Sequence, residues 1–201
     1  KSFISFSEIM KQFWNWENYQ ISWQVEGELA RNPEIAIILI HGFGACKDHW
    51  RFNQKIISSI APCYALDLLG FGESSQPDSH LLHEKKTSTS YNYCFENWSK
   101  QVFDFCNKIV KKPVILIGNS IGGVIALNTS NKLSDKCVGV ILIDCAQRTM
   151  DDKRLSEQSL LMRFLRPVIK TLVRQRFLSS NLFKNAANKT FIAKVLEVAY
   201  P

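Results

Sequence analysis

The sequence predicts an α/β fold built on a mostly parallel sheet flanked by helices, and three observations support this prediction. Short, uniformly apolar segments alternate with longer segments whose apolar residues recur every three or four positions. Segments that are apolar at every position are typical of strands buried on both faces, as in parallel sheets covered by helices. The intervals between these segments also supply the dozen or more residues that a parallel crossover requires. The chain therefore alternates strand and helix, after an antiparallel start.

Each element follows from its own pattern. Apolar and polar residues alternate from Tyr19 to Val25, which indicates a half-buried strand, with residues 13–16 as its expected partner. Strands buried on both faces are expected at 35–40, 63–66, 114–117 and 138–143. Helices are expected at 49–60, where Trp50, Ile56, Ile57 and Ile60 recur at helical spacing, and at 95–109 and 121–133. Residues 72–92 are polar and are expected to form a loop.

The chain is expected to consist of a core, residues 1–145, and a helical segment, residues 146–201. The core carries equal numbers of acidic and basic residues, whereas residues 146–201 hold 11 Lys and Arg against 4 Asp and Glu. The helical segment therefore accounts for the whole net charge of +7. Its apolar residues step by four positions, and Pro167 is expected to kink or divide the helix.

Composition excludes several classes of protein. Hydrophobic residues make up 46% and charged residues 21%, as in ordinary globular domains, and no apolar run approaches the roughly 20 residues of a membrane-spanning helix. The six cysteines form no C-x-x-C pair and no cluster with metal-ligand spacing, so we expect no metal and a reducing, cytoplasmic compartment. Gly70-Phe71-Gly72 lacks the third glycine of a dinucleotide-binding loop, and no cofactor is expected.

The strongest candidate for chemistry is Ser120. It lies in Gly118-Asn119-Ser120-Ile121-Gly122, between the expected strand 114–117 and the expected helix 121–133. The pattern G-x-S-x-G at a strand–turn–helix junction presents a serine nucleophile on a sharp, strained turn. Gly118 and Gly122 allow the strand and helix to approach closely, and the N-terminus of the helix favours a developing negative charge.

A second motif, His41-Gly42-Phe43-Gly44, directly follows the expected strand 35–40. Acyl transfer needs two preorganised donors for the oxyanion, and we expect these to be the backbone N–H groups of Phe43 and Ile121. The glycines Gly42 and Gly44 keep that backbone accessible. His41 has two interpretations, a general base or a structural histidine that braces the loop, and its position in the motif favours the structural role.

Together, His41-Gly-Phe-Gly44, Asp67-Leu-Leu-Gly-Phe-Gly-Glu-Ser74 and Gly118-Asn-Ser-Ile-Gly122 resemble the α/β-hydrolase superfamily in order and spacing. The resemblance covers about residues 15–145. The residues within its motifs are similar to those of a cyanobacterial and plastid branch that includes pheophytinase-like esterases. It implies a serine hydrolase that forms an acyl-enzyme at Ser120 on a small apolar or amphipathic carboxylic ester. Haloalkane dehalogenases and epoxide hydrolases carry aspartate at the position of Ser120. Asp67 is expected to fix its turn.

No histidine stands where the superfamily places its general base. The superfamily places serine, acid and histidine in that order, whereas all four histidines, His41, His49, His80 and His83, precede Ser120. Asp144 ends the expected strand 138–143 and is an alternative acid, although a structural role is favoured. The resemblance implies that residues 146–201 begin a helical cap and that the last strands, with acid and base, follow residue 201. We therefore expect very weak hydrolysis by this chain.

Two other functions remain open at this point. A non-catalytic α/β-hydrolase-like protein that binds an apolar ligand or a partner would explain the missing histidine. Acyl transfer to an acceptor other than water would use the same site. The basic residues of 146–201 are interpreted first as a solvated face, and second as a weak contact with an anionic membrane surface. Nucleic acid is not an expected partner, because no nucleic-acid motif accompanies the charge.

Overall fold

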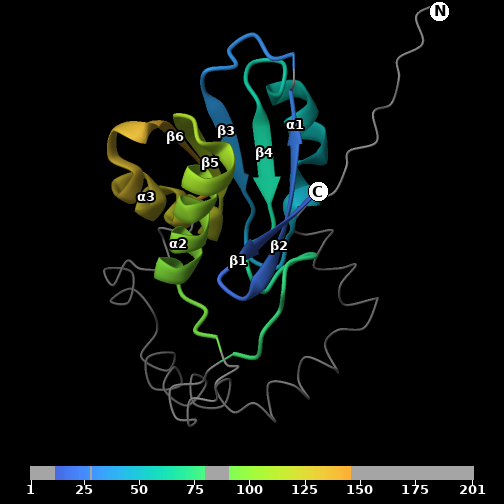
Figure 1. Ribbon diagram of the computed structural model, residues 1–201, viewed down its shortest axis with the longest axis vertical. Coiled ribbons are helices and arrows are strands. Elements are labelled where there is room, and N and C mark those ends of the chain that lie inside the picture. Colours follow the sequence, from blue (N-terminus) through green and yellow to red (C-terminus); the bar gives the residue numbers. More distant parts are fainter. Residues whose placement is uncertain (1–11, 28, 80–90, 146–201) are drawn as a thin grey trace, which may run out of the picture. The chain divides into compact units, whose positions relative to one another are not determined.

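The computed structural model describes residues 12–27, 29–79 and 91–145 (Figure 1). Every structural statement below refers to these residues. The helical segment 146–201, with its expected cap and its basic residues, lies outside them, as do His80 and His83. Predictions about these parts of the chain stay predictions.

Six strands form one mixed sheet in the order β1-β2-β4-β3-β5-β6, which confirms the predicted fold class. The strands are β1 (Gln12–Trp16), β2 (Tyr19–Glu26), β3 (Ala36–Ile40), β4 (Cys63–Leu66), β5 (Val114–Asn119) and β6 (Cys137–Ile143). The first three in sheet order pair antiparallel, and all later pairs are parallel. The carboxyl ends of β3, β5 and β6 therefore meet at one edge of the sheet, where ligands bind in open α/β folds.

Two apolar clusters cover opposite faces of the sheet, because neighbouring residues of a strand point to opposite faces. Ile38 and Ile40 of β3 belong to the larger cluster, together with buried residues of α2 (Phe95–Phe105) and α3 (Ile121–Leu133). Ile37 and Leu39 belong to the second cluster, with Trp50 and residues of β4. Figure 1 shows α2 and α3 on one side of the strands and α1 (Arg51–Ile57) on the other.

The predicted helix over residues 49–60 is only partly confirmed. The segment begins as a 3-10 turn, Lys47–Trp50, and continues as the seven-residue helix α1. Trp50 is buried as the pattern predicts, but Ile56 and Ile60 are exposed. The periodicity assumed one continuous α-helix, whereas a 3-10 turn winds three residues per turn and so rotates the later residues to another face.

The strand expected at residues 138–143 is confirmed, but in the described part of the chain it is not buried on both faces. The segment is a strand, β6, but only β5 pairs with it. It therefore forms one edge of the described sheet, and Val138, Ile141, Leu142 and Ile143 are all exposed. The uniformly apolar sequence identifies a strand, but it does not reveal how many neighbours the strand has.

Candidate active site

Ser120 lies in a sharp turn between β5 and α3. Its backbone has φ 55° and ψ −119°, a region that costs a residue with a Cβ about 1–3 kcal/mol. Two backbone hydrogen bonds hold it there: its N–H donates to Ile143 O of β6, and its carbonyl accepts from the N–H of Gly123, each at 3.0 Å. In the described part of the chain, no side chain hydrogen-bonds to its hydroxyl. The fold thus presents Ser120 in the strained geometry of a nucleophile elbow.

The glycines around Ser120 are required by close backbone contacts. A Cβ on Gly118 would overlap the carbonyl oxygen of Gly122 and lie 2.6 Å from the nitrogen of Gly123. A Cβ on Gly122 would overlap the carbonyl oxygen of Ile40 and lie 2.7 Å from that of His41. These glycines therefore let α3 begin directly against β5 and the end of β3, which positions Ser120.

The loop that follows β3 lies next to Ser120 because β3 and β5 are parallel neighbours, with Ile40 opposite Gly118. A Cβ on Gly42 would lie only 3.3 Å from the Cβ of Ser120. The N–H of Ala45 donates to Gly42 O at 3.3 Å, so the backbone turns at Phe43 and Gly44, where Gly44 has φ 72°. The ring of Phe43 is largely exposed and meets Phe71 edge to face.

The two residues expected to supply oxyanion donors, Phe43 and Ile121, lie near Ser120. Ile121 is the first residue of α3, and the first N–H groups of an α-helix have no acceptor within the helix. Phe43 follows Gly42, whose backbone lies against Ser120. The structure therefore brings Phe43 and Ile121 near Ser120, and their role as donors to an oxyanion stays a prediction.

His41 is fully buried, and both of its ring nitrogens are engaged. Nδ1 lies 2.8 Å from Gly42 O, and Nε2 lies 3.0 Å from the N–H of Leu68, which donates to it. These partners assign the neutral tautomer with the proton on Nδ1. Burial lowers the pKa of His41, against the opposing effect of the hydrogen bond to Gly42. The geometry therefore supports a histidine that braces the loop rather than a base for Ser120.

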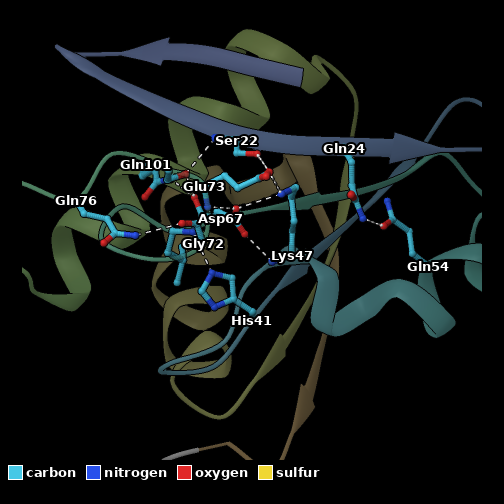
Figure 2. Close-up of polar contacts among 12 residues, drawn as sticks. Ser22, Gln24, His41, Lys47, Gln54, Asp67, Gly72, Glu73, Gln76 and Gln101 are labelled. Carbon is cyan, nitrogen blue, oxygen red and sulfur yellow. Dashed lines mark hydrogen bonds and ion pairs between the residues drawn. The ribbon is translucent and has the colours of Figure 1, made fainter. Parts of the chain in front are cut away.

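A largely buried network of ion pairs and hydrogen bonds holds the loop that follows β3 (Figure 2). Oδ1 of Asp67 accepts from the backbone N–H of Lys47 at 2.6 Å, and Oδ2 accepts from the N–H of Glu73 at 2.9 Å. The ammonium of Lys47 lies 3.3 Å from Oδ2 of Asp67 and 2.7 Å from Oε2 of Glu73. Asp67 thus ties the turn 67–73 to the loop after β3.

Sequence reasoning expected Asp67 to fix its turn but missed Lys47, which is only 1% exposed. Burial alone would lower the pKa of Lys47, but its hydrogen bond to Glu73 and the charge of Asp67 outweigh burial and raise it. No local signal marks this residue, because a lysine in a polar loop is ordinarily solvated. Gln101 of α2 was missed for the same reason: it is buried, donates to Asp67 O and accepts from the N–H of Leu69.

The described residues do not assemble an acid and a base around Ser120. Asp144 directly follows β6 with φ 43°, is exposed, and forms no hydrogen bond to a described histidine. Nε2 of His49 lies 3.5 Å from Nδ2 of Asn119, the neighbour of Ser120, and not against the serine itself. The histidine that a serine hydrolase needs therefore has no counterpart among these residues.

Metal chemistry has no support in residues 12–27, 29–79 and 91–145, where no three His, Cys, Asp or Glu side chains are grouped to hold an ion. Nor does any helix in these ranges have the length and apolarity to cross a bilayer.

All six cysteines are free, and burial raises the pKa of Cys63 and Cys106 to about 12, which leaves these two thiols protonated and unreactive.

Replacing Ser120 with glycine is expected to raise the free energy of unfolding by about 1–2 kcal/mol, because glycine adopts this backbone geometry without steric strain. The extra freedom of glycine in the unfolded chain offsets part of the gain. Ser120→Ala is the matched control, since it removes the hydroxyl but keeps the Cβ. Urea unfolding of both variants measures the difference. Equal stability of the two variants would mean that the elbow is not strained.

Comparisons with known proteins agree with this geometry. A family model described as alpha/beta hydrolase fold matches residues 35–186. The (lyso)-N-acylphosphatidylethanolamine lipase of Homo sapiens is 28% identical over 122 residues, which are 61% of this chain and 33% of that protein. The 1-acylglycerol-3-phosphate O-acyltransferase ABHD5 of Rattus norvegicus is 33% identical over 115 residues, which are 56% of this chain and 30% of that protein. The chain spans about a third of the length of these curated relatives.

A solved structure extends the likeness to three dimensions. The crystal structure of a membrane phospholipase A, described as a bacterial virulence factor, has a TM-score of 0.58 and 29% identity. The match covers 68% of this chain and 40% of that chain. These matches do not confirm the narrower pheophytinase-like branch. Because the family match covers more than half of the chain and agrees with the sheet and the serine turn, this chain belongs to the α/β-hydrolase fold family.

Proposed function

We propose that this protein is a serine hydrolase that cleaves a carboxylic ester through an acyl-enzyme at Ser120. The observation that carries the proposal is the strained backbone of Ser120 at the start of α3, directly beside Gly42 of the loop after β3. A serine is held in such a geometry only where the surrounding structure enforces it, and residues of this kind cluster at active sites.

The reaction follows from the groups around the turn. The hydroxyl oxygen of Ser120 attacks the acyl carbon, and the negative charge on the former carbonyl oxygen is stabilised by the N–H groups of Phe43 and Ile121. A histidine takes the hydroxyl proton and returns it to the leaving alcohol; water then releases the acid from the acyl-enzyme. His41 does not fit this role, because both of its nitrogens are already bonded. The base therefore belongs to a residue outside those described.

The proposed substrate is a small apolar or amphipathic ester, and no cofactor takes part. Support comes from the exposed ring of Phe43, which meets Phe71 and offers an apolar group in the loop whose Gly42 lies against Ser120. The names of the three proteins compared above, a lipase, an O-acyltransferase and a phospholipase A, all refer to acyl lipids. A cytoplasmic location is part of the proposal and rests on the six free cysteines.

A second candidate is a protein that keeps the fold but binds an apolar ligand or partner without catalysis. It is favoured by one observation: no histidine of the described residues contacts Ser120. Acyl transfer to an acceptor other than water is a variant of the main proposal, since it uses the same acyl-enzyme. Product analysis in the presence of added alcohols distinguishes transfer from hydrolysis.

A fluorophosphonate probe tests the proposal directly. We expect the probe to label Ser120 in any longer natural form that supplies the histidine, and to label the 201-residue chain more slowly by about 10³-fold or more, the scale of losing a triad histidine. Ser120→Ala is the control and takes up no label. If neither form is labelled although both are folded, the non-catalytic function replaces the proposed one.

A further inference from the structure

A cavity of about 280 Å³ lies at the opposite end of β5 from Ser120. Its walls are the end of α3 and the π-helical segment Cys106–Val110 that continues α2, two helices that pack side by side (Figure 1). Pro113, which directly precedes β5, belongs to the third wall. Because β5 spans six residues, the cavity and Ser120 are about 20 Å apart, and the cavity is separate from the candidate active site.

The cavity combines an apolar floor with a cationic rim. Cys106 and Leu133 line it and are almost fully buried. Lys111, Lys112 and Lys136 line it as well, whereas no described aspartate or glutamate does. Among the described residues, none of these three ammonium groups forms an ion pair with a carboxylate. Like charges around one cavity repel one another, so the lining favours an anionic ligand.

Neutral acceptors hold two of these lysines in place without cancelling their charge. Nζ of Lys136 donates to Oδ1 of Asn107, which also lines the cavity, at 2.8 Å. Nζ of Lys112 donates to the backbone oxygen of Pro33. An ammonium group has three donor hydrogens, so each of these lysines keeps two for a ligand.

Lys111 is held by its backbone instead. It directly follows the π-helical segment with φ 56° and ψ 26°, the left-handed conformation that glycine ordinarily adopts where a helix ends. Its N–H donates to Cys106 O at 2.8 Å, which fixes this conformation. π-helical turns and strained backbone are both frequent at functional sites, and here the two coincide at a residue that lines the cavity.

The helix ends carry negative partial charge, which opposes the lysines. The C-terminus of a helix is equivalent to about −0.5 elementary charge, so two helix ends contribute about −1. Three lysines outweigh this and leave the cavity positive by about 2. Asp135 adjoins Lys136 in sequence but does not line the cavity, and its Oδ1 accepts from the Ser134 hydroxyl at 3.4 Å. Even with this carboxylate counted, the sum stays positive.

We infer that this cavity binds a phosphate monoester with a small organic group. The phosphate carries about −1.5 to −2 charges near neutral pH, which matches the charge of the rim. It contacts the three lysines through charge-assisted hydrogen bonds, and the organic group contacts Cys106 and Leu133. The volume lies at the lower end of the range for ligand pockets, which suits a small molecule or a single headgroup. The site is independent of any chemistry at Ser120.

Isothermal titration calorimetry of the 201-residue chain with phenyl phosphate tests the inference. We expect one-to-one binding, weaker binding of inorganic phosphate and no binding of phenol, since each of these lacks one part of the ligand. K111Q/K136Q is expected to lower the affinity by at least about tenfold, because it removes two charged donors.

K108Q/K132Q is the matched control. Both lysines are exposed, belong to the same two helix ends and do not line the cavity, so this variant removes the same net charge and is expected to bind like the wild type. Equal losses in the two double variants would overturn the inference, because general attraction to a chain of net charge +7 would explain them. Wild-type affinity in K111Q/K136Q would overturn it too. Should K111Q/K136Q unfold, Lys136→Gln alone replaces it in the comparison.

Two further arms concern the occupant. Any longer natural form of the protein is titrated in the same way, and loss of binding there would show that the chain's own residues fill the cavity, which also overturns the inference. Vesicles that contain phosphatidic acid identify the source of the phosphate. Displacement of phenyl phosphate by these vesicles assigns the site to a lipid headgroup, and undiminished binding assigns it to a soluble phosphate; either result supports a phosphate monoester site.

Discussion

Lys47→Met is expected to lower the free energy of unfolding by about 3–5 kcal/mol, because it leaves the carboxylate of Asp67 buried without its cation. Asp67 is fully buried, and Lys47 is its cationic partner at 3.3 Å. The lost hydrogen bond to Glu73 adds to the effect, although the side chain of Glu73 is partly exposed and regains water. Urea unfolding of the variant and the wild type measures the difference.

The matched control is Lys100→Met. Lys100 also contacts two carboxylates, those of Glu17 and Asp104, but its side chain is 50% exposed. Because exposed ion pairs are largely compensated by water, this control is expected to change the free energy of unfolding by at most about 1 kcal/mol. Equal effects of the two substitutions would show that burial of Lys47 contributes nothing beyond a surface pair.

The stabilisation by Lys47 has a definite pH dependence. Its pKa in the folded chain lies above the ordinary value of 10.5, because Glu73 and Asp67 outweigh the opposing effect of burial. The folded state therefore holds the proton more tightly than the unfolded state. The stabilisation is complete below about pH 10.5 and is lost as the pH rises through the pKa of the folded state. The difference between wild type and Lys47→Met should shrink over that alkaline range and stay constant near neutrality.

Gly118→Ala is the second substitution with a large expected effect. A Cβ at this position meets only backbone atoms, the carbonyl group of Gly122 and the nitrogen of Gly123, and backbone in a packed strand and helix cannot rotate away. We expect the free energy of unfolding to fall by about 3 kcal/mol or more, at the upper end of overpacking effects. Displacement of α3 also moves Ser120 and Ile121, so probe labelling at Ser120 should be lost with it.

Gly139→Ala is the control for this prediction. Gly139 lies in β6, has no positive φ, and a Cβ there would meet only side-chain atoms of Ile115, at 3.6 Å and beyond. That distance is ordinary van der Waals contact, so the variant is expected to stay within about 1 kcal/mol of the wild type, on the stabilising side. The requirement for glycine at position 118 would be disproved if both variants unfolded at the same urea concentration.

Residues that contact distant parts of the chain could not be predicted from sequence. The burial of Lys47 depends on Asp67 and Glu73, which a different strand and turn bring to it. Gln54 is buried because its Oε1 accepts a hydrogen bond from Nε2 of Gln24 in β2 and its Nε2 donates to Cys63 O of β4. Each of these side chains is polar, and local pattern therefore assigns it to the surface. Only pairing across the sheet supplies the partner that makes its burial favourable.

The sequence by itself determined the alternation of strands and helices, the position of α3, and the turn that holds Ser120. These features depend on local periodicity and on glycines within a few residues of the serine, so they are encoded in short segments. The motifs also predicted that the loop after β3 and the turn at Ser120 act together, and the parallel pairing of β3 with β5 brings the two side by side. Tertiary structure alone decided that α1 turns its apolar side outward, since this depends on which neighbours the helix has.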